Sequence, residues 1–324
     1  MAYAIRFNEA GSPDVMRYEE VQVGEPGPGE ARVRHTAIGV NYIDTYHRSG
    51  LYKLPLPSGL GSEGAGVVVS VGPNVDWVKA GDRVAYSGGP IGAYASERVL
   101  PADRLVKIPE GVSDREAATL MLKGLTVQYL FRQTYRLQGG ETILFHAAAG
   151  GVGLIACQWA RALGVTMIGT VGSDDKAKLA REHGCAHTIV YTRENFVERV
   201  KEITGGKGVP VVYDSIGRDT FPASLDCLQP RGLFVSFGSA SGPITAFDIS
   251  ILAQKGSLYA TRPTLFTFAS NRATLAAMAD EMFGLVKEGK IKSEPRQQFA
   301  LKDAAQAHRA LESRGTVGAT VLIP

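Results

Sequence analysis

The sequence predicts an α/β protein with two domains, one rich in β-strands and one built on a doubly wound parallel sheet. Three observations lead to this prediction. Short strand patterns between Pro and Gly turns fill the chain as far as about residue 123, and strands alternate with helices from residue 125 onward. The third is a glycine-rich turn at residues 146–153, between an apolar strand and an expected helix. A length of 324 residues also suits two cores better than one.

The first part of the chain reads as a compact antiparallel β domain with few helices. Its strand patterns alternate or run apolar, and Pro/Gly turns such as residues 25–29 and 72–74 separate them. Residues 79–84 form a turn that enters a further strand. The expected strands are residues 2–7, 17–23, 31–38 and 64–71.

From residue 125 the pattern of apolar residues changes, and expected helices alternate with expected strands. This spacing is typical of a parallel, doubly wound sheet. The expected helices are residues 126–135, 154–163, 174–183, 195–203 and 221–228. The expected strands are residues 142–145, 165–171, 187–190, 209–213, 233–237 and 257–261.

The tail contains a long helix (271–288), a strand (297–301), a helix (304–313) and a final strand (319–323). It could extend the second domain or return to the first, and the order of β-rich part before α/β part favours a return. We therefore expect the boundaries 1–124, 125–263 and 264–324, with the first and third segments in one domain.

The glycine turn reads His146-Ala-Ala-Ala-Gly-Gly-Val-Gly153. A turn between strand and helix aims backbone N–H groups and the positive end of the helix dipole at a phosphate, and glycine lets the backbone approach closely. Ala148 stands where the first glycine of the G-x-G-x-x-G fingerprint would be, so the setting carries the interpretation. The candidate cofactor-binding residues here are Ala149, Gly150, Gly151, Val152 and Gly153.

The end of the next strand favours NADPH over NADH. An enzyme that prefers NAD places an acidic residue there for the ribose hydroxyls. Here the strand ends on Gly172, and Ser173 and Lys176 offer a hydroxyl and an ammonium to a 2′-phosphate. Asp174 and Asp175 would repel that phosphate if they faced it, and we expect Asp174 to cap the following helix and turn away.

Composition predicts an ordinary globular protein of the cytoplasm. Hydrophobic residues make up 44% of the chain and charged residues 21%, and a net charge of +3 does not imply a nucleic-acid partner. Residues 1–6 hold no signal-peptide core, and three widely spaced cysteines are no disulfide framework. Residues 142–160 lack charged side chains, but the glycine turn in their middle argues against a membrane span.

The run from Gly140 to Gly153, together with residues 39–46, 61–66, 80–84, 121–126 and 261–263, resembles the quinone oxidoreductases, the zeta-crystallin branch of the medium-chain dehydrogenase/reductase superfamily. The resemblance covers the whole chain. It implies a GroES-like catalytic domain built from both chain ends around a central Rossmann domain, which agrees with a returning tail.

The resemblance also indicates whether the protein should bind zinc. Zinc-dependent relatives use Cys and a His-Glu pair, but Asn41 stands where the first Cys would fall and Gly61-Ser62-Glu63 replaces Gly-His-Glu. No cysteine precedes Cys157, and zinc sites of this kind need thiolate and imidazole ligands, so we expect no metal. His183 and His187 flank Cys185, but Gly184 should end the helix and keep the two rings apart.

Without a Lewis acid, the chemistry should suit an acceptor that needs none, such as a quinone. The resemblance implies that Asn41 and Tyr46 face the nicotinamide and the quinone, with Tyr52 at the cleft and Arg262 on the opposite wall. Tyr46 and Tyr52 could instead be surface rings that only pack. We expect Asp44 to be a buried structural partner, not a base.

The resemblance assigns further cofactor contacts to Lys123 and Thr126, near the nicotinamide ribose and ring, to Tyr191, at the adenosine phosphate, and to Gly238. Cys157 should lie in the core. Exposed sheet edges need covering, and we expect a homodimer through edges formed by residues 231–237 and 256–262.

Two other functions stay open. Reduction of an activated C=C bond in an enone or 2-alkenal uses the same hydride chemistry. A secondary role in binding single-stranded RNA occurs in some relatives, although no stripe of Lys/Arg interleaved with aromatics is visible.

Overall fold

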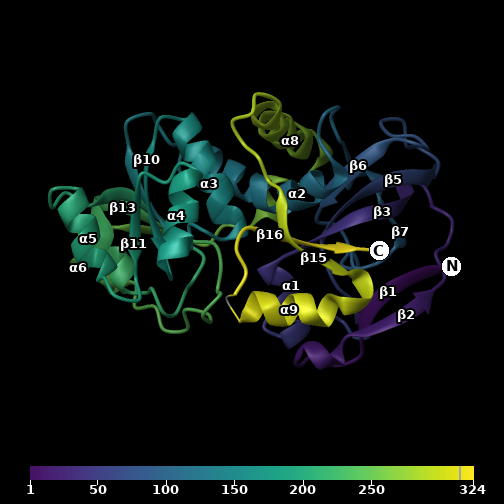
Figure 1. Ribbon diagram of the computed structural model, residues 1–324, viewed down its shortest axis with the longest axis horizontal. Coiled ribbons are helices and arrows are strands. Elements are labelled where there is room, and N and C mark those ends of the chain that lie inside the picture. Colours follow the sequence, from purple (N-terminus) through teal and green to yellow (C-terminus); the bar gives the residue numbers. More distant parts are fainter. Residues whose placement is uncertain (314) are drawn as a thin grey trace. The chain divides into compact units, whose positions relative to one another are not determined.

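The structure is a computed structural model that describes residues 1–313 and 315–324. The chain forms two compact units, and the α/β fold class expected from the sequence is confirmed (Figure 1). Unit 1 comprises residues 1–125 and 268–324, and unit 2 comprises residues 126–267. The first boundary lies after residue 125, one residue beyond the one expected after residue 124. The second lies after residue 267, four residues beyond the one expected after residue 263.

Unit 1 is built on a seven-stranded sheet with the order β15-β16-β3-β5-β6-β8, in which β7 also pairs with β3. A smaller sheet has the order β2-β1-β4. All pairs are antiparallel except β15 with β16. The strands are β1 (Ala2–Phe7), β2 (Arg17–Val21), β3 (Glu30–Val40), β4 (Ser58–Gly59), β5 (Glu63–Val71), β6 (Arg83–Ser87), β7 (Glu97–Pro101), β8 (Val106–Lys107), β15 (Pro295–Ala300) and β16 (Ala319–Ile323).

The tail returns to unit 1 because β16 pairs with β3, with Thr320 opposite Val40. In Figure 1 the last strands therefore lie beside strands from the start of the chain. Alternate residues in the first part of β3, among them Ala31 and Val33, are buried, as expected for a strand with one face on a core, and its last four residues are all buried. The core of unit 1 also includes Tyr86 and Tyr94.

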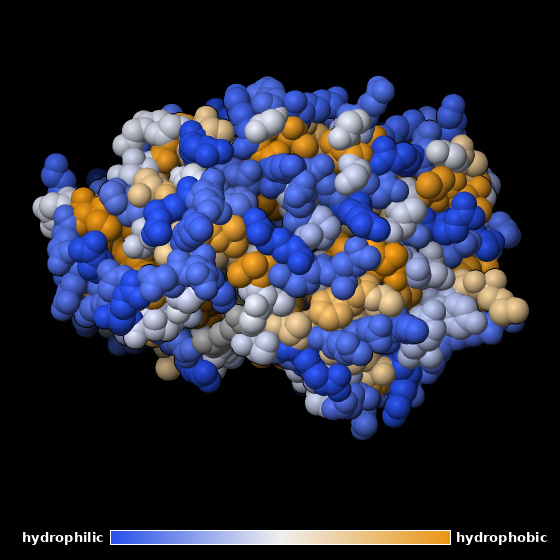
Figure 2. All heavy atoms as spheres, in the orientation of Figure 1, coloured by the Kyte–Doolittle hydropathy of each residue, from blue (hydrophilic) through white to orange (hydrophobic). Residues whose placement is uncertain are grey.

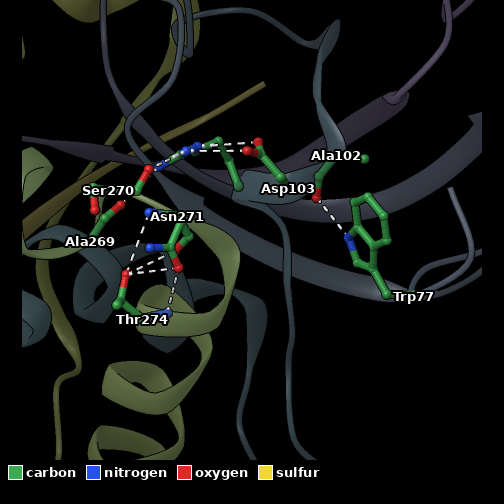
Figure 3. A network of polar contacts seen from close by, with 8 residues as sticks. Trp77, Ala102, Asp103, Ala269, Ser270, Asn271 and Thr274 are labelled. Carbon is green, nitrogen blue, oxygen red and sulfur yellow. Dashed lines mark hydrogen bonds and ion pairs between the residues drawn. The ribbon is translucent and has the colours of Figure 1, made fainter. Parts of the chain in front are cut away.

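Arg104 connects the returning segment to the first part of unit 1 through hydrogen bonds to Ala269 and Ser270, which are labelled in Figure 3. Its guanidinium donates to the carbonyl oxygens of Ala269 at 2.9 Å and Ser270 at 3.1 Å. Helix α8 (Arg272–Lys287) begins immediately afterwards, where the Asn271 side chain accepts the Thr274 N–H at 3.0 Å. Unit 1 also contains α1 (Tyr42–Ser49) and α9 (Ala304–Glu312).

Unit 2 is built on six parallel strands in the order β11-β10-β9-β12-β13-β14, with helices on the sheet (Figure 1). The order reverses between β9 and β12, which is where open parallel sheets bind ligands. The strands are β9 (Thr142–Phe145), β10 (Thr166–Val171), β11 (His187–Val190), β12 (Val209–Asp214), β13 (Leu228–Ser236) and β14 (Tyr259–Thr261). The helices are α3 (Gly151–Ala162), α4 (Asp174–Glu182), α5 (Phe196–Ile203) and α6 (Ser250–Gln254), and α7 (Leu265–Phe268) follows at the limit of the unit.

Two expected helices were wrong in extent. The helix expected at residues 126–135 is α2 (Asp114–Tyr129), which ends in a π-helical turn over Leu130–Thr134. It starts early because Ser113 accepts the N–H of Glu116. The helix expected at residues 221–228 is only the 3-10 turn Ala223–Cys227, because Leu228 already begins β13.

The expected edge strands were right only in part. Residues 256–262 include β14, which is the edge strand next to β13. Residues 231–237 fall mostly in β13, which pairs with β12 on one side and β14 on the other. The second edge of the sheet is β11.

Among the described residues, no helix combines the length and apolar character needed to cross a bilayer. On the face drawn in Figure 2, hydrophilic side chains predominate and apolar ones form separate patches.

Candidate active site

Asn41 stands at the junction of β3 and α1 and is 5% exposed. Its backbone N–H donates to Asp44 Oδ2 at 2.9 Å, and its side-chain Nδ2 donates to Glu63 Oε2 at 2.8 Å. Helix α1 ends at Gly50, whose φ of 83° is readily available only to glycine. The residue expected to face the nicotinamide is therefore held by two carboxylates, its side chain by Glu63 and its backbone by Asp44.

Glu63 is fully buried at the start of β5 and was given no role from the sequence. Three donors meet its carboxylate: Asn41 Nδ2, the Leu122 N–H at 2.6 Å, and Lys123 Nζ at 3.1 Å. A buried carboxylate is tolerated only with such partners. The signal that could have found it is the single acidic residue in the otherwise uncharged run from Gly59 to Val75.

Asp44 is a fully buried structural partner, as expected. Its Oδ2 accepts the hydroxyl of Tyr94 at 2.9 Å, and that hydroxyl lies 3.0 Å from Nε2 of His308. Burial raises the pKa of Asp44 to about 7 and lowers the pKa of His308 to about 3. The network joins α1 to α9 inside unit 1, and sequence reasoning missed it because its members lie far apart in the chain.

Tyr46 and Tyr52 form an aromatic cluster beside Tyr42 and His47. The ring centroids of Tyr46 and Tyr52 are 5.3 Å apart, and those of Tyr42 and Tyr46 are 6.3 Å apart. The Tyr52 N–H donates to the Tyr46 carbonyl at 3.0 Å, which closes the turn after α1. Both residues are half-buried, and their contact with a substrate stays a prediction.

In unit 2 the glycine turn connects β9 to α3, with Gly150 as the N-cap. Ala147 adopts a left-handed φ of 58°, and its carbonyl accepts the Gly150 N–H at 3.0 Å. A Cβ on Gly153 would lie 2.3 Å from that same carbonyl, so helix and turn pack too closely for any side chain there. Backbone N–H groups at the start of a twelve-residue helix are suited to a phosphate.

At the ends of β10 and β11, the structure brings together Gly172, Ser173, Lys176 and Tyr191. A Cβ on Gly172 would lie 3.0 Å from the Tyr191 hydroxyl, and the Tyr191 N–H donates to the Val171 carbonyl at 3.1 Å. Gly172 thus leaves space beside the Tyr191 hydroxyl that a larger residue would fill, and Ser173 and Lys176 follow it at the start of α4.

The cap of α4 was assigned wrongly. Ser173, not Asp174, is the N-cap, and its hydroxyl accepts the Lys176 N–H at 3.4 Å. Asp174 instead accepts two hydrogen bonds of 2.6 Å from Arg193, which lower the pKa of its carboxyl. The negative charge expected to repel a phosphate is therefore paired with a cation.

Arg262 follows β14 and holds the loop after β13. Its guanidinium donates to Ser236 Oγ at 2.8 Å, to the Gly238 carbonyl at 2.7 Å and to Ser239 Oγ at 3.1 Å. A Cβ on Gly238 would lie 2.5 Å from the Ser215 carbonyl. These contacts hold the Arg262 guanidinium against the loop after β13, and the expected contacts of Arg262 and Gly238 with substrate and cofactor stay predictions. Thr126, three residues after Lys123 on α2, is also buried.

Cys157 is buried in α3, as expected, and Cys185 and Cys227 are buried too. Gly184 has a φ of 105° and ends α4, which separates His183 from His187. Within the part of the chain that the structure describes, no three His, Cys, Asp or Glu side chains gather in a way that could hold a metal ion.

Comparison with known proteins identifies the family. Residues 27–110 match the alcohol dehydrogenase GroES-like domain, and residues 151–282 match the zinc-binding dehydrogenase family. A quinone oxidoreductase of Pseudomonas aeruginosa is 60% identical over 325 residues, covering 100% of both chains. The chain belongs to the quinone oxidoreductase family. The resemblance and the GroES-like and Rossmann architecture expected from the sequence are thereby confirmed.

Two further similar proteins are informative. The crystal structure of Escherichia coli quinone oxidoreductase complexed with NADPH has a TM-score of 0.98 at 52% identity, covering 99% of this chain and 100% of the other. A 2-haloacrylate reductase from a Burkholderia species is 48% identical, covering 100% of this chain and 99% of the relative.

Proposed function

We propose that this chain is an enzyme that reduces quinones with NADPH and without zinc. The observation that carries the proposal is its full-length likeness, at 52% identity, to a quinone oxidoreductase crystallised with NADPH. That likeness agrees with the cofactor and substrate expected from the sequence.

The residues of unit 2 fit the cofactor. Residues Ala149 to Gly153 suit a pyrophosphate, because they form the glycine-rich turn and the N-terminus of α3, where backbone N–H groups and the helix dipole favour a phosphate. Ser173 and Lys176 suit a 2′-phosphate, with the Tyr191 ring beside them. We assign further cofactor contacts to Lys123, Thr126, Gly172 and Gly238.

NADPH supplies the hydride, and the chain has to orient the acceptor and stabilise the charge that develops on its oxygen. We assign these tasks to Asn41, Tyr46, Tyr52 and Arg262. The two tyrosines offer O–H donors without a metal, and Asn41 has a second amide hydrogen besides the one that it gives to Glu63. Glu63 is engaged by three protein donors, and no cysteine occurs before residue 157, so this donor set does not suit zinc.

A second activity is reduction of an activated C=C bond. It is favoured by the 48% identity to a 2-haloacrylate reductase. A quinone and an enone both accept hydride at an electron-poor conjugated carbon, so the same residues could serve both.

Steady-state assays separate the two activities. We expect kcat/KM with NADPH to be higher for 1,4-benzoquinone and 9,10-phenanthrenequinone than for a 2-alkenal or 2-chloroacrylate. Faster turnover of either alkene would reverse the order, and no oxidation of NADPH with any acceptor would refute the proposal. A titration with single-stranded RNA, with NADPH as competitor, tests the RNA-binding alternative.

Cofactor preference is tested at Lys176. Lys176→Met should raise the KM for NADPH about tenfold or more, because it removes a charged hydrogen bond to phosphate, and should leave the KM for NADH nearly unchanged. Lys178→Met is the matched control, since Lys178 is exposed on the same helix. Equal effects on NADPH and NADH would contradict this assignment.

We further propose a homodimer through the edge strand β14. Among the described residues this strand pairs with β13 alone, and Tyr259 on it is 56% exposed. Light scattering should give twice 34.5 kDa. Tyr259→Lys should weaken the dimer, whereas Tyr18→Lys, at an exposed tyrosine of β2, should not. A monomer at micromolar concentration would rule out this arrangement.

We place the protein in the cytoplasm. Three buried, unpaired cysteines suit a reducing compartment. Fractionation of cells that express the full chain tests this, and recovery from the membrane or periplasmic fraction would contradict it.

A further inference from the structure

We propose that Glu63 is a positioning residue, which fixes the side chains of both Asn41 and Lys123. Turnover depends on Glu63 although it does not touch the substrate. The inference rests on the proposed function, since Asn41 and Lys123 are assigned there to the substrate and the cofactor. The juxtaposition itself lies entirely within unit 1.

One oxygen of Glu63 links the two assigned residues. Oε2 accepts both Asn41 Nδ2, at 2.8 Å, and Lys123 Nζ, at 3.1 Å. The other oxygen, Oε1, accepts the Leu122 N–H at 2.6 Å, which ties the carboxylate to the backbone of α2. Movement of this carboxylate would therefore move an amide and an ammonium together.

The carboxylate of Glu63 is closely surrounded by other parts of unit 1. Glu63 is 0% exposed, and Lys123 is 5% exposed. A Cβ on Gly39 would lie 2.1 Å from Glu63 Oε2 and 2.3 Å from the Ala118 carbonyl. Strand β3, strand β5 and helix α2 thus enclose the carboxylate, and Gly39 provides the space that it occupies.

The charge of Glu63 decides which way the Asn41 amide faces. A carboxylate only accepts hydrogen bonds, so it selects the NH₂ side of the amide and turns the Asn41 Oδ1 away. The Asp44 carboxylate fixes the same residue from its backbone N–H. A glutamine at position 63 would have one acceptor oxygen for three donors, and the amide of Asn41 would lose its single orientation.

The first test is Glu63→Gln. We expect kcat for quinone reduction at saturating NADPH to fall about 10- to 100-fold, the size of effect that small misplacements of reacting groups produce. The control is Glu116→Gln on the same helix as Lys123, where Glu116 Oε1 accepts the Ser293 N–H at 3.3 Å. That variant should turn over like the wild type. If Glu63→Gln does not fold, Glu63→Asp keeps the charge but shortens the reach, and kcat should again fall.

A double-mutant cycle separates positioning from a merely structural role. Asn41→Ala and Lys123→Met are combined with Glu63→Gln, and kcat and the NADPH Kd are measured for every variant. If Glu63 acts through these residues, its substitution should change kcat little in the Asn41→Ala background and the Kd little in the Lys123→Met background. Full additivity in both backgrounds, or wild-type kinetics of Glu63→Gln and Glu63→Asp, would overturn the inference.

The proposed function fails separately. If the wild type binds NADPH but reduces no quinone, the substrate assignment is wrong, and the cycle on the NADPH Kd still tests the coupling of Glu63 to Lys123.

Discussion

Gly39 and Gly284 show how differently two glycines of one unit respond to the same change. A Cβ on Gly39 would collide with Glu63 Oε2 at 2.1 Å, whereas a Cβ on Gly284, inside α8, meets nothing within 4 Å. Gly39→Ala should lower the free energy of unfolding by about 1–3 kcal/mol or more through overpacking. Gly284→Ala should raise it by about 0.5–1 kcal/mol, because alanine favours helix.

Urea denaturation of both variants measures these changes. A Gly39→Ala protein as stable as the wild type would mean that Glu63 can leave its position, which would also weaken the positioning inference.

Asp44 makes stability depend on pH in an unusual direction for a carboxyl group. Its pKa is raised to about 7 in the folded chain, against an ordinary value of 3.8. Between about pH 4 and pH 7 the folded state holds a proton that the unfolded state releases, so this group lowers stability as the pH rises. Asp44→Asn resembles the protonated form and should remove that loss.

The measurement is the difference in unfolding free energy between the wild type and Asp44→Asn at several pH values from 4.5 to 7.5. This difference cancels the contribution of His35, whose pKa is lowered to about 4 by burial and which acts in the opposite sense. His308, which Tyr94 links to Asp44, has a pKa lowered to about 3 by burial and so stays neutral in the folded chain over this range. Parallel pH profiles for the two proteins would contradict the assignment.

Among the elements, the start of α4 combines a cap with a charge pair. Ser173 caps the helix, and Asp174 is held by Arg193. Asp174→Asn should lower the NADPH Kd several-fold and leave the NADH Kd unchanged, because a negative charge is removed and Arg193 becomes available to a phosphate.

Fluorescence titration with each cofactor provides the measurement, and Glu182→Gln at the opposite end of α4 is the control. Weaker binding of NADPH by Asp174→Asn would show that the Asp174–Arg193 pair itself holds the site in place.

The elements also show where sequence patterns were sufficient. Strands 142–145 and 187–190 have the expected ends, and α8 begins after the capping residue Asn271. Residues 221–228 have an apolar pattern that suits a helix, but Leu228 is the first residue of strand β13. The period of apolar residues does not show whether a segment will form a helix or pair with a neighbouring strand, because strand pairing depends on residues far away in the chain.

For the whole molecule, the important feature is that unit 1 takes its last strands from the end of the chain. Residues 126–267 hold a complete six-stranded sheet, whereas β3 needs β16 as its neighbour. We expect residues 126–267 alone to unfold cooperatively and residues 1–125 alone to stay unfolded, since Val321 and Leu322 are fully buried in the complete unit.

Circular dichroism during thermal unfolding of the two fragments measures this. A cooperative transition of residues 1–125 would show that the tail adds stability to unit 1 without being required for its fold.

The sequence by itself determined the fold class, the glycine turn and the residues offered to a 2′-phosphate. These features lie in short continuous stretches, where the spacing of residues alone predicts which groups will lie next to one another. Ser173 and Lys176 lie beside Gly172 because three or four residues make one helical turn.

Only the tertiary structure decided the network around Glu63 and the network of Asp44, Tyr94 and His308. Their members come from strands and helices separated by as many as 214 positions, as between Tyr94 and His308. Burial then determines which of them keep a charge, because the cost of an unpaired ion depends on the surroundings that folding creates.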